Sequence, residues 1–170
     1  VVLVGFSVAL YALADKHLHR QVDERLEGAV HTLVAAAEVG PEGVEWEPEE
    51  RNLTFGRRTL EGQFAWRVGD LDGTRVDGSA TGEIGRLLAR LGTRVAPARG
   101  VASIVDEAGN HWRAMSRRLT RPPSEDHESR DIPPQPGRHA ALVLGAATSL
   151  EGVRATLRNL ALALGGLSLA

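Results

Sequence analysis

Histidine is the most versatile catalytic and metal-binding side chain in this sequence, which contains six of them. Only His17 and His19 are close neighbours. Both fall in a segment with helical periodicity, where residues two positions apart point to different faces, so they are poorly placed to bind one metal ion together. Cysteine is absent, which excludes disulfides and thiolate zinc sites. We therefore expect neither a metal site nor a cofactor in this chain.

Nucleophilic catalysis is not indicated either. A serine hydrolase needs a nucleophile on a sharp turn beside a base, and the Gly-x-Ser-x-Gly pattern of such a turn does not occur in the sequence. We expect no catalytic residue and no enzyme activity within these residues.

Arginine and tryptophan side chains form the best candidate for ligand binding. Arg113 and Arg117, with the neighbouring Arg118, could meet an anionic ligand, and Trp66 and Trp112 could supply apolar walls. The alternative is that these residues form the outer faces and the core of ordinary strands.

The segment from Glu38 to Glu50 is rich in glutamate and has no basic residue. Its carboxylates could hold divalent cations against anionic headgroups, or bind a cationic effector, because carboxylate oxygens suit hard cations. The alternative is a solvated acidic loop.

Overall composition limits the possible partners. The net charge of -2 and the isoelectric point near 6.3 argue against nucleic-acid binding, which requires a basic face. With 170 residues, of which 42% are hydrophobic and 25% charged, the chain has the composition of one globular domain.

Hydrophobic periodicity indicates which elements hold these residues. One apolar stripe predicts a long helix that ends at Gly40 and Pro41. Residues 63–79 alternate as strands around Asp72-Gly73 and predict a β-hairpin. The stripe comprises Leu18, Val22, Leu26, Ala29, Leu33 and Ala37.

The second half of the chain continues the mixed pattern. A short amphipathic helix is expected from Ile84 to Leu91, ending at Gly92, and a second hairpin over residues 101–119. Residues 121–137 are rich in proline and predict an exposed loop. Residues 140–147 are small or apolar throughout, which is typical of a strand buried on both faces.

Both ends of the sequence are apolar. Residues 1–14 carry no charge, and the last charged residue is Arg158. We expect residues 1–14 to be the C-terminal part of one transmembrane helix and residues 159–170 to be the N-terminal part of a second, both truncated. Neither run alone reaches the roughly 20 apolar residues of a spanning helix, so buried core helices or a signal-peptide region are the alternatives.

The final helix is predicted to begin with a capping box, Thr148-Ser149-Leu150-Glu151. Apolar residues then recur at steps of three and four, which indicates a helix that packs against partner helices and runs into the membrane. They are Leu150, Val153, Leu157, Leu160, Leu164 and Leu167. The first four are our candidates for a signal-transmitting stripe.

This order of elements resembles the input segment of bacterial two-component sensor histidine kinases. The first hairpin reads FAWRVGDLDGTRVDGS, a later strand reads HWRAMSRRL, and the approach to the last helix reads AATSLEGVRATLRNLALAL. The resemblance implies an α+β fold, a PAS-like or Cache-like antiparallel sheet with a long N-terminal helix, flanked by the two transmembrane helices.

The same resemblance implies a function. Residues 15–158 would be an extracytoplasmic sensor domain anchored in the bacterial inner membrane as a homodimer, responding to an unknown small ligand or ion. The parent protein would be a protein histidine kinase that phosphorylates a cytoplasmic response regulator through a kinase core absent from these residues. Other membrane transducers, namely chemoreceptors and cyclic-dinucleotide enzymes, could use the same architecture, and a soluble α+β binding module is the remaining alternative.

Overall fold

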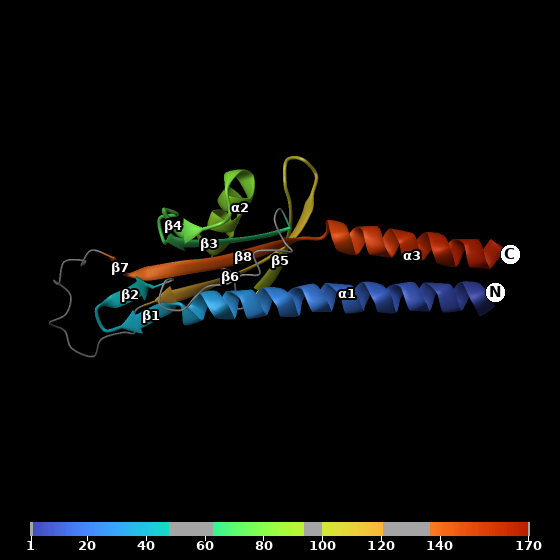
Figure 1. The fold of residues 1–170 in the computed structure, drawn as a ribbon, viewed down its shortest axis with the longest axis horizontal. Helices are drawn as coiled ribbons and strands as arrows, with labels where there is room; N and C mark the ends of the chain where they lie inside the picture. The colour runs from blue at the N-terminus through green and yellow to red at the C-terminus, as the bar shows by residue number, and fades with distance from the viewer. Residues whose placement is uncertain (1, 48–62, 94–99, 121–136, 170) are drawn as a thin grey trace.

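The computed structural model describes residues 2–47, 63–93, 100–120 and 137–169. Helices and strands follow one another along these residues, and the chain folds as an α+β structure with antiparallel sheets and a long N-terminal helix, as the sequence predicted (Figure 1). The elements are α1 (Val2–Ala35), β1 (Ala37–Gly40), β2 (Gly43–Trp46), β3 (Phe64–Asp70), β4 (Arg75–Gly78), α2 (Gly82–Thr93), β5 (Gly100–Val105), β6 (His111–Thr120), β7 (Arg138–His139), β8 (Ala141–Ser149) and α3 (Glu151–Leu169).

The larger sheet has five antiparallel strands in the order β4-β3-β8-β6-β5. Its central strand is β8, which pairs with β3 on one side and with β6 on the other. Residues 141–148 are all buried, because β8 has neighbours on both edges and helices on both faces. The prediction of a strand buried on both faces is therefore confirmed.

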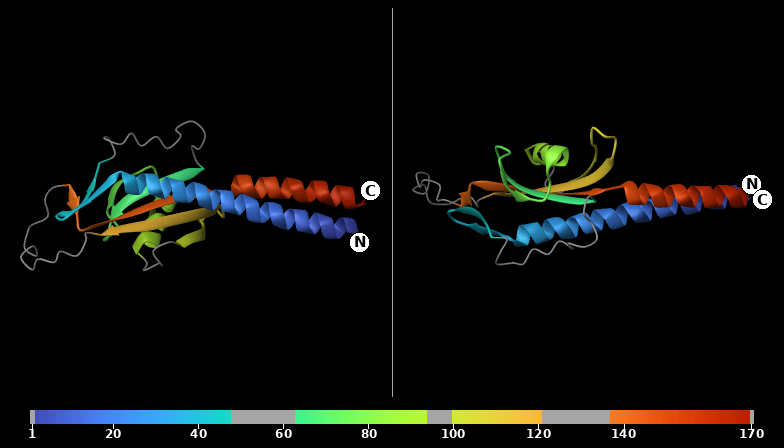
Figure 2. Two further views of the ribbon diagram at one scale, coloured as in Figure 1. Left: turned by 90° about the horizontal axis from the view of Figure 1, so that it is seen from below. Right: turned by 45° about the horizontal axis from the view of Figure 1, so that its top comes forward.

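The two faces of this sheet are covered by different helices (Figures 1 and 2). The C-terminal half of α1 lies on one face, where Leu26, Val30 and Leu33 pack against β8 and β3. On the other face α2 packs through Leu88, and the β3–β4 and β5–β6 hairpins rise on either side of it (Figure 2). Successive residues of β8 alternate between the two cores, as the pleat of a strand requires.

Both predicted hairpins and the short helix are confirmed. In the first hairpin Gly73 has a φ of 88°, and the amide of Asp70 donates to the carbonyl of Thr74 at 2.9 Å. In the second, Gly109 has a φ of 84°. Glycine is favoured at both positions because its backbone enters this left-handed region without steric cost. The predicted helix over residues 84–91 is part of α2.

The predicted end of the first helix is wrong. α1 stops at Ala35, Gly40 is the last residue of β1, and Pro41 lies in the turn of the hairpin formed by β1 and β2. This hairpin is favoured over further helix because it pairs the backbone of residues 37–40 and buries Val44 against Leu33. The acidic segment, expected to be a loop, thus supplies two strands of a small sheet ordered β1-β2-β7.

The capping box is also corrected in part. A helix does begin at Glu151, but Thr148 and Ser149 belong to β8. The Thr148 hydroxyl donates to the carbonyl of Gln63 at 3.0 Å and therefore does not cap the helix. The Ser149 hydroxyl accepts from the amide of Glu151 at 3.2 Å. The proline-rich stretch lies outside the described residues, except for Gly137.

Candidate functional site

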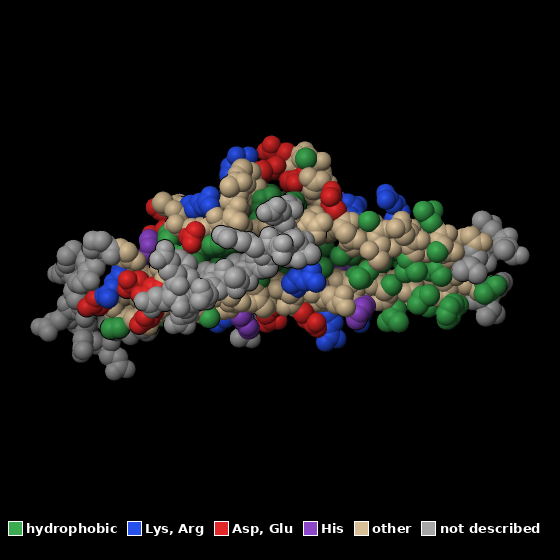
Figure 3. Space-filling view, in the orientation of Figure 1, with side chains coloured by type: hydrophobic (Ala, Val, Ile, Leu, Met, Phe, Trp, Pro, Cys, Tyr) green, Lys and Arg blue, Asp and Glu red, His purple; other side chains and the backbone are tan. Residues whose placement is uncertain are grey.

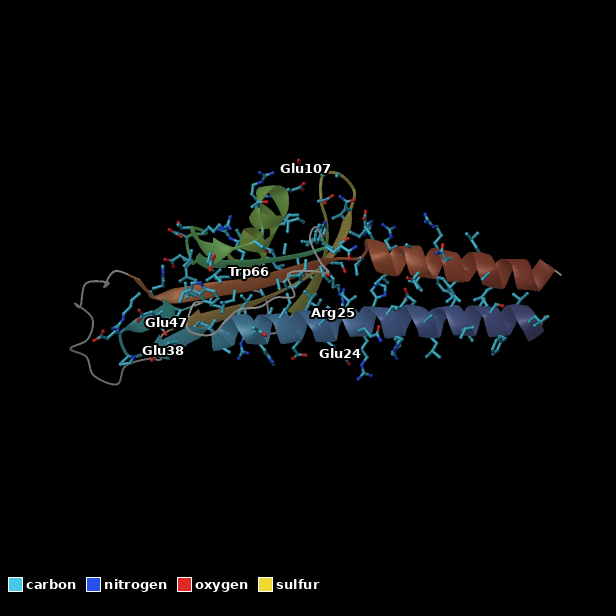
Figure 4. All side chains as sticks on the ribbon, viewed as in Figure 1. Glu24, Arg25, Glu38, Glu47, Trp66 and Glu107 are labelled. Carbon is cyan, nitrogen blue, oxygen red and sulfur yellow. The ribbon has the colours of Figure 1, made fainter. Side chains whose placement is uncertain are left out.

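α1 and α3 are in contact and run antiparallel beyond the sheet (Figures 1 and 2). The N-terminal half of α1 extends past the strands, and α3 lies beside it, so both chain ends lie at the same end of the molecule. Side chains from both helices fill the space between them (Figure 4). This helix pair is a continuous connection from the sheet to that end.

The candidate signal-transmitting residues lie on the less exposed face of α3 and at Leu150, which directly precedes it. Leu150 and Leu157 are 6% and 5% exposed, and Val153 and Leu160 are half-buried. The residues between them are exposed. The structure therefore brings all four together along one stripe, and their role in signalling stays a prediction.

The junction between β8 and α3 is a single residue long, since β8 ends at Ser149 and α3 begins at Glu151. The amide of Ser149 donates to the carbonyl of Gln63, and the amide of Leu150 donates to the carbonyl of His111, both at 2.8 Å. The amide of Arg154 closes the first helical turn onto Leu150 at 2.9 Å. The start of α3 is thereby fixed to the strands on both sides of β8.

An ion pair joins α1 to the sheet close to this junction. Arg113 of β6 donates to both carboxylate oxygens of Asp23, from Nε at 2.7 Å and from Nη2 at 2.9 Å. Its third nitrogen donates to the Ser103 hydroxyl at 2.8 Å. Hydrogen bonding to Asp23 raises the pKa of Arg113, and partial burial opposes that effect. Asp23 was not among the predicted site residues, because its partner lies 90 positions along the chain.

The four candidate ligand contacts do not form one site. Trp112 packs with Leu88 on the α2 face of the sheet, whereas Trp66 packs with the α1-face residues. Arg113 reaches Asp23 on α1, and Arg117 stands opposite Leu144, whose side chain is in the α1-face core. The sheet therefore separates Trp112 from the other three. Strand alternation already required Trp112 and Arg113, as neighbours, to point to opposite faces.

Arg67, which was not among the predicted site residues, lies on the α2 face of the sheet. Arg67 lines a narrow hollow of about 10 Å³ with Leu88 and Gly145, which is room for roughly one water molecule. Its guanidinium donates to the carbonyl of Gly73. Burial, and to a lesser degree the positive charge of Arg75, lower the pKa of Arg67.

Arg138 of β7 forms ion pairs with acidic residues of the β1–β2 hairpin. This arginine forms one ion pair with Glu42 and a second, at 3.3 Å, with Glu45 of β2. Together with Glu38 they border an open hollow of about 210 Å³ at the end of the molecule opposite the termini, where Figure 4 places Glu38 and Glu47. Within the described ranges, no group of three or more histidine, aspartate or glutamate side chains is arranged to hold a metal ion.

Apolar side chains gather at the end of the molecule that carries the termini (Figure 3). Val8 is 64% exposed and Leu162 is 70% exposed, and neither helix carries a charge in residues 2–14 or 159–169. The exposed apolar residues of this surface are Leu3, Val4, Phe6, Val8, Leu10, Tyr11, Leu13 and Leu162. We call this surface the apolar end of the helix pair.

None of the helices in the described part of the chain is both long enough and apolar enough to cross a membrane. Comparison with protein-family models, with curated proteins and with solved structures finds no match for this chain.

Proposed function

We propose that this chain is the signal-sensing input domain of a membrane-bound sensor histidine kinase. In this proposal the sheet and its covering helices form a PAS-like or Cache-like sensor outside the inner membrane, and the apolar end of the helix pair enters the bilayer. The domain senses a stimulus and transmits it, and a cytoplasmic kinase core elsewhere in the parent protein performs the chemistry.

The observation that supports the proposal is the position of the two charge-free segments. They come from opposite ends of the sequence, yet they lie side by side beyond the sheet and expose apolar side chains. A solvent-facing helix pair normally carries charged residues on its outer surface. Contiguous apolar surface of this kind marks a site that a membrane or a partner covers.

The fold is compatible with the resemblance found in the sequence. A long N-terminal helix lies on one face of an antiparallel sheet, and the last strand leads directly into the final helix. That layout is the one implied by the likeness to sensor-kinase input segments, and it leaves the α2 face, the α1 face and the acidic hairpin as surfaces where a stimulus could act.

Transmission follows from the same geometry. A ligand can shift a receptor only through a difference in its affinity for two packings of the protein. In a homodimer the two copies of α1 and α3 would form a four-helix bundle in the membrane. Because α3 is joined to β8 without a flexible linker, a displacement of the central strand would move Leu150, Val153 and Leu157 against α1.

Membrane anchoring is tested by placing one charge on the apolar end. Val8→Asp should sharply reduce the fraction of the expressed chain that sediments with membranes after an alkaline wash, because an aspartate in the bilayer core costs about 3 kcal/mol. Val105→Asp is the matched control, since Val105 is 52% exposed against 64% for Val8 but lies at the end of β5, outside the charge-free segments of the two helices. Equal membrane association of both variants and the unmodified chain would contradict the proposal, and recovery of the unmodified parent protein in buffer would favour the soluble binding module.

The parent sequence provides a second check. Residues 2–14 of α1 extend over about 20 Å at 1.5 Å per residue, which is short of the roughly 30 Å hydrocarbon core. The proposal therefore requires further apolar residues before Val1 and after Ala170 in the parent protein. A linker domain and a dimerisation helix containing His-Glu farther along would identify a histidine kinase, whereas other output domains would identify a chemoreceptor or a cyclic-dinucleotide enzyme.

A further inference from the structure

Positive charge is concentrated where the charge-free segments end. Lys16 is the first cation of α1, and Arg154 and Arg158 are the last cations of α3. All three residues are exposed. Asp15, which directly precedes Lys16, faces the imidazole of His19 at 3.3 Å. We call Lys16, Arg154 and Arg158 the cationic collar.

The collar lies at one level of the helix pair. Lys16 is about 21 Å along α1 from Val2, and Arg154 and Arg158 are about 22 Å and 17 Å along α3 from Leu169, at 1.5 Å per residue. The two helix ends lie next to each other (Figure 1). The cations of both helices therefore form a band that directly borders the apolar end.

The exposed stripes of the two helices change from apolar to cationic in the same direction. On α3, Leu162, Arg158 and Arg154 follow one another at steps of four and share one face. On α1, Lys16 lies three residues beyond the exposed Leu13. An exposed apolar stripe that passes into lysine and arginine is the pattern by which helices meet the headgroup layer of a bilayer.

The collar cations form no ion pair within the described part of the protein. The ion pairs found there use other cations, for example Arg20 with Glu24 and Arg113 with Asp23, and none of them includes a collar residue. The chain as a whole has a net charge of -2, so its overall charge would not attract an anionic surface. The collar supplies the positive charge that borders the apolar end of the helix pair.

We propose that the cationic collar binds the headgroups of anionic phospholipids and thereby sets the depth at which the helix pair stops in the membrane. The inference rests on the proposed function, because it names the lipid class that the same membrane-facing end prefers. The apolar end supplies insertion, which is indifferent to headgroup charge, and the collar supplies the preference for negative headgroups.

The test compares two kinds of vesicle. The purified 170-residue chain is floated with vesicles of phosphatidylcholine alone or of phosphatidylcholine mixed with phosphatidylglycerol, at low and at high salt. The unmodified chain should bind the mixed vesicles more strongly, and salt should reduce the difference because it screens exposed charges. Neutralising a collar residue, as in Lys16→Gln or Arg158→Gln, should reduce the preference about fivefold per cation.

The control is Arg86→Gln, which removes the charge of an exposed arginine on α2, the helix that covers the sheet face opposite α1. It should leave the preference unchanged, and circular dichroism should show that every variant remains folded. Equal binding of the unmodified chain to both vesicles, or a preference that survives the double change of Lys16 and Arg158 to Gln, would overturn the collar and leave the proposed function standing. Absence of binding to either vesicle would contradict both.

Discussion

Arg113 was predicted as a ligand contact, and in the structure each of its three guanidinium nitrogens donates a hydrogen bond within the protein. It holds Asp23 of α1 in a bidentate pair and reaches Ser103 of the neighbouring strand. The two charged side chains are 24% and 32% exposed, so solvent screens them less than an ordinary surface pair. Such a pair fixes the position of α1 on the sheet, and removing one partner leaves the other poorly solvated.

Asp23→Ala should therefore lower the free energy of unfolding by about 1–3 kcal/mol, between the values typical of exposed and of buried pairs. A double-mutant cycle with Arg113→Ala, measured by urea denaturation, isolates the coupling between the two side chains. The control cycle uses Arg20 and Glu24, an exposed pair four residues apart on the same helix. A coupling between Asp23 and Arg113 no larger than that of the control pair would show that this contact does not hold α1 in place.

At this scale the sequence predicted which residue types are notable but not how they combine. Trp66 and Trp112 pack in cores on opposite faces of the sheet, whereas Arg113 forms an ion pair with Asp23. Alternation along β6 was readable and would have separated Trp112 from Arg113. The pairing with Asp23 was not, because no local pattern relates residues 90 positions apart.

Among the elements, α2 lies close to the central strand β8, and at Gly92 its backbone contacts the side chain of Val143. A side chain at Gly92 would place its Cβ 3.2 Å from Cβ of Val143 and closer still to one of the valine methyl groups. Glycine at this position lets the end of α2 lie directly on β8. The requirement is one of space, since valine is stiff about its first side-chain torsion and cannot easily turn away.

Gly92→Ala should lower the free energy of unfolding by about 1–3 kcal/mol through overpacking. Val143→Ala in the same chain should relieve the clash, so that the double variant is more stable than the sum of the two single effects predicts. Thermal or urea unfolding measures all three. Gly28→Ala is the matched control, because Gly28 is exposed in α1 with open space around it, and alanine there should stabilise by about 0.5–1 kcal/mol. Destabilisation by Gly28→Ala comparable with that of Gly92→Ala would contradict the argument from space.

Sequence patterns predicted most elements because the signals were local. The glycines of both hairpin turns, the amphipathic pattern of α2 and the unbroken apolar run of β8 each specify one structure. The end of α1 was missed because Gly40-Pro41 is an equally good signal for a turn between two strands. Tertiary contacts decided between them, since residues 43–46 pair with residues 37–40 and Val44 completes the core beneath Leu33.

For the whole molecule, the proposed function assigns Leu157 to the path between sensor and membrane. Leu157→Glu should change the basal autophosphorylation of a receptor containing this domain about fivefold or more, because couplings between sites are commonly worth 1–3 kcal/mol. Ala155→Glu is the control, as it adds the same charge to an exposed position two residues away on α3. The measurement is the rate of autophosphorylation in membrane vesicles.

Unchanged kinase activity in the Leu157 variant, with its expression and membrane content intact, would show that this helix face does not carry the signal. The prediction separates a signalling role from a purely structural one, since a variant that merely unfolded would lose membrane-bound receptor as well.

At the same scale, the sequence predicted that the final helix packs against partner helices, and the antiparallel contact of α3 with α1 agrees with that expectation. Strand order was not predictable beyond the pairing of strands within each of the two hairpins. Its connections skip between distant segments, and the choice of neighbours depends on the twist and packing of the complete sheet.

The one-residue junction at Leu150 fixes the rotational phase of α3 relative to the sheet. Each added or deleted residue there would turn the whole helix by about 100°, because an α-helix has 3.6 residues per turn. The sheltered leucines would then face away from α1 while their sequence stayed intact. An insertion of seven residues would nearly restore the original facing, with about 20° of residual rotation, so activity along such an insertion series would vary periodically with its length.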